Sequence, residues 1–221
     1  MKKYVFLFIS VLISFAHPSY SDINQQLNQD LPAQQQKLSE AIEEYKKAIE
    51  INPTDAAAHY NLGLAYVQKQ MLDEAIAEFQ IAVSLRPDYA MAHTGLGLAY
   101  VQKGLLDEAI SELTIAIQID PNLAAAHYNI GVAYYVKEMF DEAISEFKQA
   151  IELNPTLATA HYNLGLVYKA RQMYALAIVE YQKAIEINPN LAMAYYNLGN
   201  VYLETDMLDE AIAEYKKTIA I

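Results

Sequence analysis

The chain has 221 residues, and 54% of them are hydrophobic, which is enough for one or two domains with an apolar core. Its 27 acidic residues outnumber the 15 Lys and Arg residues, and the net charge of −12 argues against nucleic acid or an anionic membrane surface as the partner. The absence of cysteine excludes disulfides, thiolate metal sites and cysteine nucleophiles.

Residues 1–21 are predicted to be a secretory signal peptide. Lys2 and Lys3 give a basic start, residues 4–16 form an apolar run, and small residues follow. The run is shorter than the roughly 20 residues that span a bilayer, which suits the hydrophobic region of a signal peptide. An uncleaved membrane anchor is the alternative. We expect cleavage after Ala16 or Ser21, export to the periplasm or the medium, and no membrane association afterwards.

Residues 22–36 are rich in Gln and Asn, contain Pro32 and show no periodicity, so they are predicted to form a flexible lead-in. From residue 37 onward the sequence repeats every 34 residues, and a proline closes each unit, at Pro53, Pro87, Pro121, Pro155 and Pro189. The predicted units are a half-repeat that caps the N-terminal end, four full repeats and an incomplete last repeat, over residues 37–55, 56–89, 90–123, 124–157, 158–191 and 192–221.

Each full repeat is predicted to contain two helices. One face of the first helix is marked, at the spacing i, i+3, i+4 and i+7, by His59, Leu62, Gly63 and Tyr66. Residues 72–83 carry the apolar face of the second helix, with Asp73 at its expected N-cap. Two antiparallel helices can share these apolar faces, and stacked pairs cover the flank that each pair leaves open. The predicted fold is therefore all-α, an α-solenoid of antiparallel helix hairpins.

This pattern resembles the tetratricopeptide repeat (TPR) family over residues 37–221. The places that the family conserves are filled in the first full repeat by Leu62, Gly63, Tyr66, Ala75, Phe79 and Pro87. The resemblance implies a right-handed superhelix whose first helices line a concave surface that binds proteins. Counted from the start of each repeat, His replaces the family's usual Trp or Leu at the fourth place of four repeats. The chain stops at Ile221 without the extra helix that normally covers the last repeat.

No set of residues predicts catalysis. His59, His93, His127 and His161 occur once per repeat, about 10 Å apart by helix packing, which is too far for ligands of one metal ion. They are interpreted as packed, hydrogen-bonded histidines. Acidic pairs such as Asp73 and Glu74 are interpreted as solvent-exposed residues at the start of a helix. We expect no enzyme activity, no metal and no cofactor.

The first helices carry a second face that packing does not use. In the first full repeat this face consists of Ala57, Asn61, Leu64 and Gln68. An exposed apolar strip among polar groups usually marks a binding surface. The predicted peptide-binding groove is lined by Tyr60, Asn61, Leu64, Tyr128, Asn129, Val132, Tyr162, Asn163, Leu166, Tyr196, Asn197 and Asn200.

Four asparagines stand at the sixth place, in the middle of the first helices, where each costs about 0.5 kcal/mol relative to alanine. A carboxamide both donates and accepts, so repeated amides can hold an extended peptide backbone. The arrangement resembles the asparagine ladder in the TPR superhelix of O-linked N-acetylglucosamine transferase, and Thr94 and Gly95 interrupt it. Relics of recent repeat duplication are the alternative. If the ladder binds peptide, replacing Asn129, Asn163 and Asn197 with alanine is expected to weaken binding without loss of stability.

The leading interpretation is a non-catalytic, exported TPR scaffold that binds extended peptide segments of partner proteins in its concave groove. One alternative is a self-assembly element that stacks on another copy through the uncovered face of residues 192–221. Another is a truncated repeat region of a larger transferase.

Overall fold

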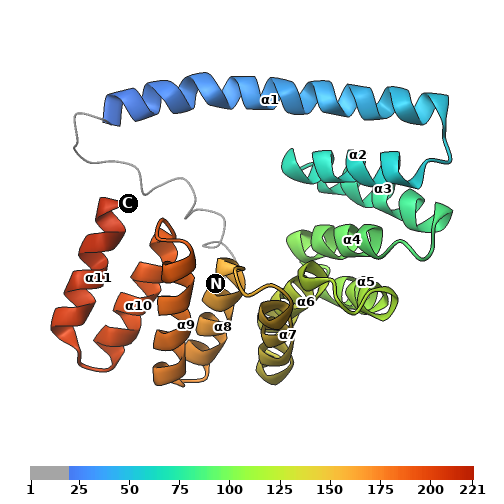
Figure 1. Ribbon diagram of the computed structural model, residues 1–221. Helices are drawn as coiled ribbons and strands as arrows, with labels where there is room; N and C mark the ends of the chain where they lie inside the picture. The colour runs from blue at the N-terminus through green and yellow to red at the C-terminus, as the bar shows by residue number, and fades with distance from the viewer. Residues whose placement is uncertain (1–19) are drawn as a thin grey trace. The chain divides into compact units, whose positions relative to one another are not determined.

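The computed structural model describes the backbone of residues 20–221 and the side chains of residues 35–221 (Figure 1). The predicted signal peptide, apart from residues 20 and 21, lies outside the described residues. The described part of the chain consists of eleven α-helices without a strand. No helix in this part is long and apolar enough to span a membrane.

Helix α1 runs from Tyr20 to Ile51. Residues 22–36 therefore have helical backbone, which differs from the flexible lead-in predicted for them. The prediction rested on the missing apolar periodicity and on Pro32, whereas Gln, which occurs six times in this segment, is a good helix former. The chain divides into two compact units, residues 1–44 and residues 45–221, and the second unit holds all the complete hairpins.

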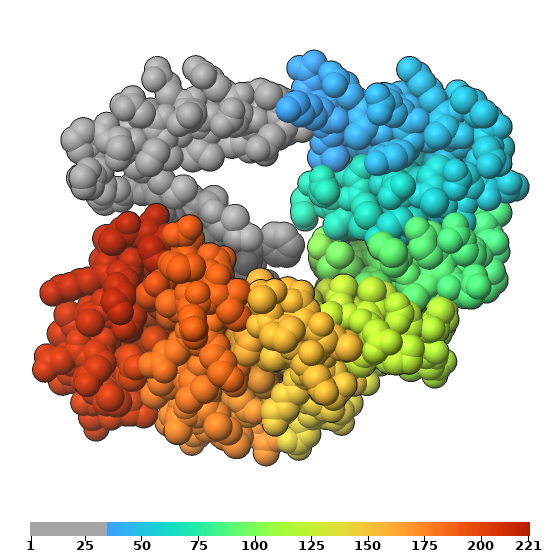
Figure 2. All heavy atoms as spheres, viewed as in Figure 1, coloured from blue at the N-terminus to red at the C-terminus, as the bar shows by residue number. Residues whose placement is uncertain are grey.

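The second unit is a stack of five antiparallel hairpins. Their first helices are α2 (Ala56–Gln68), α4 (Ala90–Lys103), α6 (Ala124–Val136), α8 (Ala158–Ala170) and α10 (Ala192–Glu204). Their second helices are α3 (Leu72–Leu85), α5 (Leu106–Ile119), α7 (Phe140–Leu153), α9 (Tyr174–Ile187) and α11 (Leu208–Ala220). Each second helix through α9 also packs on the first helix of the next hairpin, and the hairpins follow one another from blue-green to red in Figure 2. The predicted all-α solenoid is confirmed.

The first helices lie on the inner side of this stack. Neighbouring first helices contact one another from α2 through α10, whereas among the described helices no second helix contacts the next second helix. A stack whose members approach more closely on one side curves toward that side. The first helices therefore line the concave surface, as the family resemblance implied.

A glycine at the eighth place lets the two helices of each hairpin approach closely. A Cβ atom added at Gly131 would lie 2.9 Å from two ring carbons of Phe147, which is completely buried. The ring of α7 thus rests against the bare backbone of α6, and a side chain there would have to displace it.

The acidic residues at the start of the second helices are exposed, as predicted, but Asp73 is not the N-cap. Helix α3 begins at Leu72 after Met71, so Asp73 lies in the first turn and is not the N-cap. It forms an ion pair with Lys103 of the next repeat. The same spacing produces the pairs Lys137–Asp107 and Arg171–Asp141. These ion pairs join neighbouring repeats. Their two residues are 30 positions apart in the sequence, so the pattern of a single helix cannot predict them.

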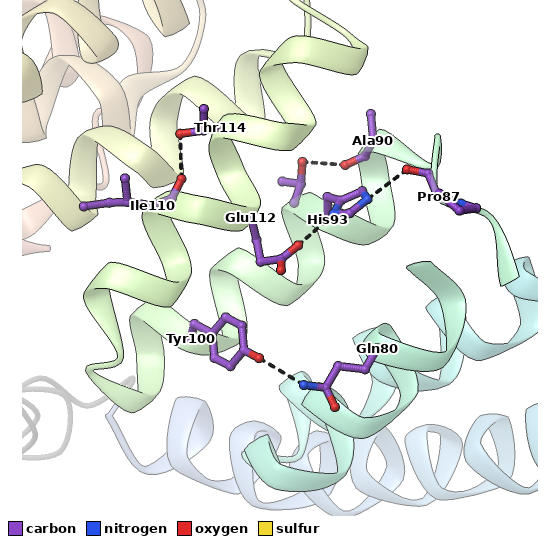
Figure 3. A network of polar contacts seen from close by, with 9 residues as sticks. Gln80, Pro87, Ala90, His93, Tyr100, Ile110, Glu112 and Thr114 are labelled. Atoms are coloured by element: carbon purple, nitrogen blue, oxygen red, sulfur yellow. Dashed lines mark hydrogen bonds and ion pairs between the residues drawn. The ribbon is translucent and has the colours of Figure 1, made fainter. Parts of the chain in front are cut away.

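The repeat histidines are buried and hydrogen-bonded, as predicted. In four repeats Nδ1 of the histidine lies 2.6 to 2.7 Å from Oε2 of a glutamate 19 residues later. In three of them Nε2 also lies 3.0 to 3.1 Å from the carbonyl oxygen of the proline that closes the preceding repeat. Figure 3 shows this arrangement for His93, Glu112 and Pro87. Because a prolyl carbonyl oxygen only accepts, Nε2 is the donor in this contact, and Nδ1 faces the carboxylate.

Candidate functional site

The predicted groove residues all lie on first helices of the concave side, but in differing environments. Asn129 and Asn197 are buried, each with 8% of its surface exposed, whereas Tyr196 is 44% exposed. The other predicted residues are partly buried. The concave face is therefore not a uniform row of free amides.

Two of the asparagines are hydrogen-bonded to a tyrosine of the preceding repeat. The Asn163 amide nitrogen donates to the Tyr128 hydroxyl oxygen at 2.9 Å, and that of Asn197 donates to the Tyr162 hydroxyl oxygen at 3.0 Å. We term each of these bonds a Tyr–Asn joint. Asn197 also donates to the carbonyl oxygen of Met193 at 2.9 Å. For Asn163 and Asn197, the expectation that alanine leaves the fold equally stable is therefore revised.

The phenol in the second Tyr–Asn joint stays protonated at ordinary pH. Burial, with smaller contributions from Tyr135 and Tyr128, raises the pKa of Tyr162 to about 12, although the Asn197 hydrogen bond lowers it. A hydroxyl that accepts from an amide and keeps its own proton can still donate to another acceptor. The joint therefore leaves a donor on the concave side.

Both joints that would involve the second full repeat are missing. Gly95 has no side chain to pair with Tyr60, and Thr94 stands where the other repeats have tyrosine, opposite Asn129. The Thr94 hydroxyl donates instead to the Ala90 carbonyl oxygen of its own helix at 2.9 Å. Asn129 is 8% exposed, and within the described part of the chain no hydrogen bond is found for its carboxamide. The amide atoms are not among the fully buried polar atoms that lack a partner, so they still reach solvent.

A hollow of about 180 Å³ opens where these joints are missing. It lies on α2, α4 and α6, and its lining is mostly apolar: Tyr60, Leu64, Met91, Thr94, Gly95, Leu98, Leu123, Ala125 and Asn129. Tyr60, Leu64 and Asn129 were predicted as site residues, and Met91, Gly95, Leu98 and Ala125 lie at places of the same predicted helix face. The signal for the hollow itself was the pair Thr94 and Gly95, where two large side chains of the pattern are lost together.

The floor of the groove carries no formal charge at four of its places on the first helices. No Lys, Arg, Asp or Glu occurs at the second, fifth, sixth or ninth place of any repeat. Toward the last repeats a charged pair lies further along the first helices, where Lys169 Nζ is 3.3 Å from Glu204 Oε1. In the part of the chain that the structure describes, no three His, Asp or Glu residues are grouped to hold a metal ion. The chemistry of the floor is that of apolar surfaces, amides and phenols.

Among the described residues, the hydroxyl of Tyr181 lacks the hydrogen bond that the hydroxyl of Tyr215 makes at the same place in the last repeat. Tyr215 donates to Asn200 Oδ1 at 2.8 Å, whereas the equivalent of Asn200 in the preceding repeat is Leu166. Tyr181 is completely buried, its hydroxyl has no partner among the described residues, and burial raises its pKa.

The variant Tyr181→Phe is therefore expected to raise the free energy of unfolding by about 1 kcal/mol, because it removes a buried polar atom without a partner. Phe79 and Phe147 already occupy this place in two other repeats. Chemical denaturation measures the effect, and Tyr215→Phe, which loses a hydrogen bond, should lower stability instead. A Tyr181→Phe protein less stable than the wild type would contradict this account.

Sequence profiles of one repeat family cover the helical hairpins. A profile described as TPR repeat matches residues 30–70, 63–104, 97–137, 134–172 and 166–206, and one described as tetratricopeptide repeat matches residues 192–221. The chain belongs to the tetratricopeptide repeat family.

Solved structures share this fold. The crystal structure of MamA is 31% identical, with 72% of this chain and 93% of that chain covered and a TM-score of 0.65. YrrB, described as a TPR protein with an unusual peptide-binding site, is 26% identical. The match covers 80% of this chain and 91% of that chain, with a TM-score of 0.62. The Cut9-Hcn1 hetero-tetramer of APC/C is similar in fold alone. Its sequence is 22% identical, the match covers 84% of this chain and 37% of that chain, and the TM-score is 0.77. No curated protein sequence gives a significant match.

Proposed function

We propose that this chain is a non-catalytic scaffold that binds extended peptide segments of partner proteins on the concave face of α2, α4, α6, α8 and α10. The observation that carries the proposal is the uncharged surface at Asn129, a residue 8% exposed whose carboxamide still reaches solvent beside an apolar hollow. A peptide-binding site is also named for YrrB, which is 26% identical to this chain.

An extended peptide matches the spacing of the first helices. Packed helices lie about 8–10 Å apart, which is about three residues of an extended chain at roughly 3.3 Å per residue. Each successive repeat therefore meets a new segment of about three peptide residues. The amides and phenols of the floor can both donate and accept, as a backbone with alternating N–H and C=O groups requires.

Binding without catalysis is favoured because the repeat histidines are engaged in the fold. In four repeats, the imidazole is held by a glutamate of the same hairpin, so it is not available as a general base toward a ligand in the groove.

Selection of random peptides displayed on phage against the full chain tests this function. We expect enrichment of largely uncharged peptides, and we expect hydrogen exchange to slow on the first helices when a selected peptide is bound. Failure to enrich any peptide over a heat-denatured control, or protection confined to the second helices, would overturn the proposal.

We also propose that the protein is exported. The basic start, the apolar run over residues 4–16 and the small residues that follow it support this. N-terminal sequencing of the protein from the exporting cell should find a new terminus after Ala16 or Ser21. A mature protein that still begins with Met1 would contradict cleavage.

Self-association is a second candidate function, favoured by the outer face of α11. Leu208, Ile212 and Ile219 are 56%, 51% and 84% exposed. Ile144 and Ile178, which occupy the place of Ile212 in earlier repeats, are partly buried there. Sedimentation should find a concentration-dependent dimer that Ile212→Lys weakens, because a charge would be buried in the contact. A wild-type chain that remains a monomer at high concentration would eliminate this candidate.

A further inference from the structure

We propose that the hollow on α2, α4 and α6 is the specificity-determining subsite of the groove: it receives one large apolar side chain of the bound peptide, while the Asn129 carboxamide holds the adjoining peptide backbone. This inference rests on the proposed peptide binding and identifies the class of segment that is bound.

The size and lining of the hollow fit a single apolar side chain. Its volume is about 180 Å³, with Leu64, Leu98 and Leu123 among the side chains around it. A cavity of about 150 Å³ lined by aliphatic and aromatic residues accommodates a benzene molecule. The hollow therefore has room for a leucine or phenylalanine side chain, and it offers no charge to neutralise an acidic or basic one.

Asn129 supplies the polar contact beside this apolar space. Only 8% of its surface is exposed, and its carboxamide has no hydrogen-bond partner in the described part of the chain. The equivalent Asn163 and Asn197 each donate to a tyrosine. The Asn129 carboxamide is not among the fully buried polar atoms without a partner, so it still reaches solvent. A peptide group can take the place of water there by accepting from the amide N–H and donating to the amide oxygen.

The missing Tyr–Asn joints single out this position in the groove. From the third full repeat to the last repeat, the phenols of Tyr128 and Tyr162 accept hydrogen bonds from the amides of Asn163 and Asn197. At the hollow, the Thr94 side chain is shorter than the tyrosine of the other repeats, and its hydroxyl donates a hydrogen bond to a carbonyl oxygen of its own helix. Gly95 cannot take a side chain without movement, because a Cβ atom there would lie 2.7 Å from the buried ring of Phe79. A peptide side chain can enter between these residues.

The variant Thr94→Tyr tests the inference, because it introduces the residue that the other full repeats have at this place. The new phenol should fill the hollow and accept from Asn129. The probes are a peptide selected by display on the wild-type chain and the same peptide with its enriched apolar residue changed to alanine. We expect the wild type to prefer the apolar form at least tenfold. Thr94→Tyr should lose at least tenfold in affinity and lose this preference, while its melting temperature rises.

A matched control is Thr114→Tyr on the second helix α5, where Thr114 donates to the Ile110 carbonyl oxygen (Figure 3). Thr94 makes the same kind of hydrogen bond to the Ala90 carbonyl oxygen. The control should bind both peptides as the wild type does. If Thr94→Tyr does not fold, Ala125→Leu, at an exposed position on the hollow, replaces it and should give the same loss.

The outcomes separate the two proposals. Peptides that bind the wild type and Thr94→Tyr equally well would overturn the subsite and leave peptide binding in the groove intact. The same holds if enriched peptides contain no recurrent apolar residue. If no peptide is enriched at all, both the proposed function and the subsite are contradicted.

Discussion

Replacing His127 with alanine is expected to lower the free energy of unfolding by about 3 kcal/mol, because it breaks a largely buried pair and leaves charge without a partner. His127 is 7% exposed, and its Nδ1 lies 2.7 Å from Glu146 Oε2. Its Nε2 lies 3.1 Å from the carbonyl oxygen of Pro121. The substitution thus leaves two acceptors unsatisfied where two helices and a turn meet, and chemical denaturation measures the loss.

The last repeat supplies the reverse experiment. Tyr195 stands where the other full repeats have histidine, and Glu214 Oε2 is buried without a partner among the described residues. Tyr195→His should therefore raise stability, by about 1 kcal/mol, because it supplies a donor to that oxygen. If His127→Ala were neutral, or if Tyr195→His were as damaging as His127→Ala, the histidine–glutamate pair would not be a stabilising element of the repeat.

Asn129→Ala and Asn163→Ala are expected to act in opposite directions on stability. Asn163→Ala should lower the free energy of unfolding by about 1 kcal/mol, because it removes the donor to Tyr128. Asn129→Ala breaks no described bond and should raise stability by up to about 0.5 kcal/mol, since alanine is the better helix former. In peptide binding, Asn129→Ala should cost roughly tenfold in affinity, the equivalent of about 1.4 kcal/mol, because it removes an amide that the ligand would satisfy.

Thermal melts and calorimetric titrations of the two variants, side by side, check these signs. Relics of repeat duplication would give a gain in stability at both positions and no loss of affinity at either. A loss of stability at Asn129 equal to that at Asn163 would show that both asparagines serve the fold alone.

The solenoid could be predicted because packing determines most of the repeated letters. The spacing of His59, Leu62, Gly63 and Tyr66 defines one buried helix face whatever the neighbouring repeats contain. The burial of the histidines followed from the same face. These inferences need only the geometry of one helix and the fact that its apolar face has to be covered.

The Tyr–Asn joints could not be predicted in this way, because they connect residues 35 positions apart on different first helices. On the wheel of one helix, Asn163 and Asn197 lie on the face turned away from the core, which suggested that their amides were free. The distance between neighbouring helices decides instead whether a phenol reaches the amide. The ion pair of Asp73 could not be predicted for a related reason, since its partner Lys103 belongs to the next repeat.

The hollow is harder still to predict, because it arises from two side chains that are missing. Thr94 and Gly95 interrupt the repeated pattern and were interpreted as a break in a binding ladder. Only the packing of three consecutive first helices turns that break into a space beside Asn129.

Methyl NMR of the full chain, titrated with a peptide selected by display, tests the central claim that peptides bind on the concave face. The account predicts that the methyl signals of Leu64, Met91 and Leu98, which line the hollow, shift on binding. Those of Leu176 and Val179, which are 43% and 45% exposed on the second helix α9, should stay unchanged. Shifts confined to Leu176, Val179 or other residues of the second helices would contradict it.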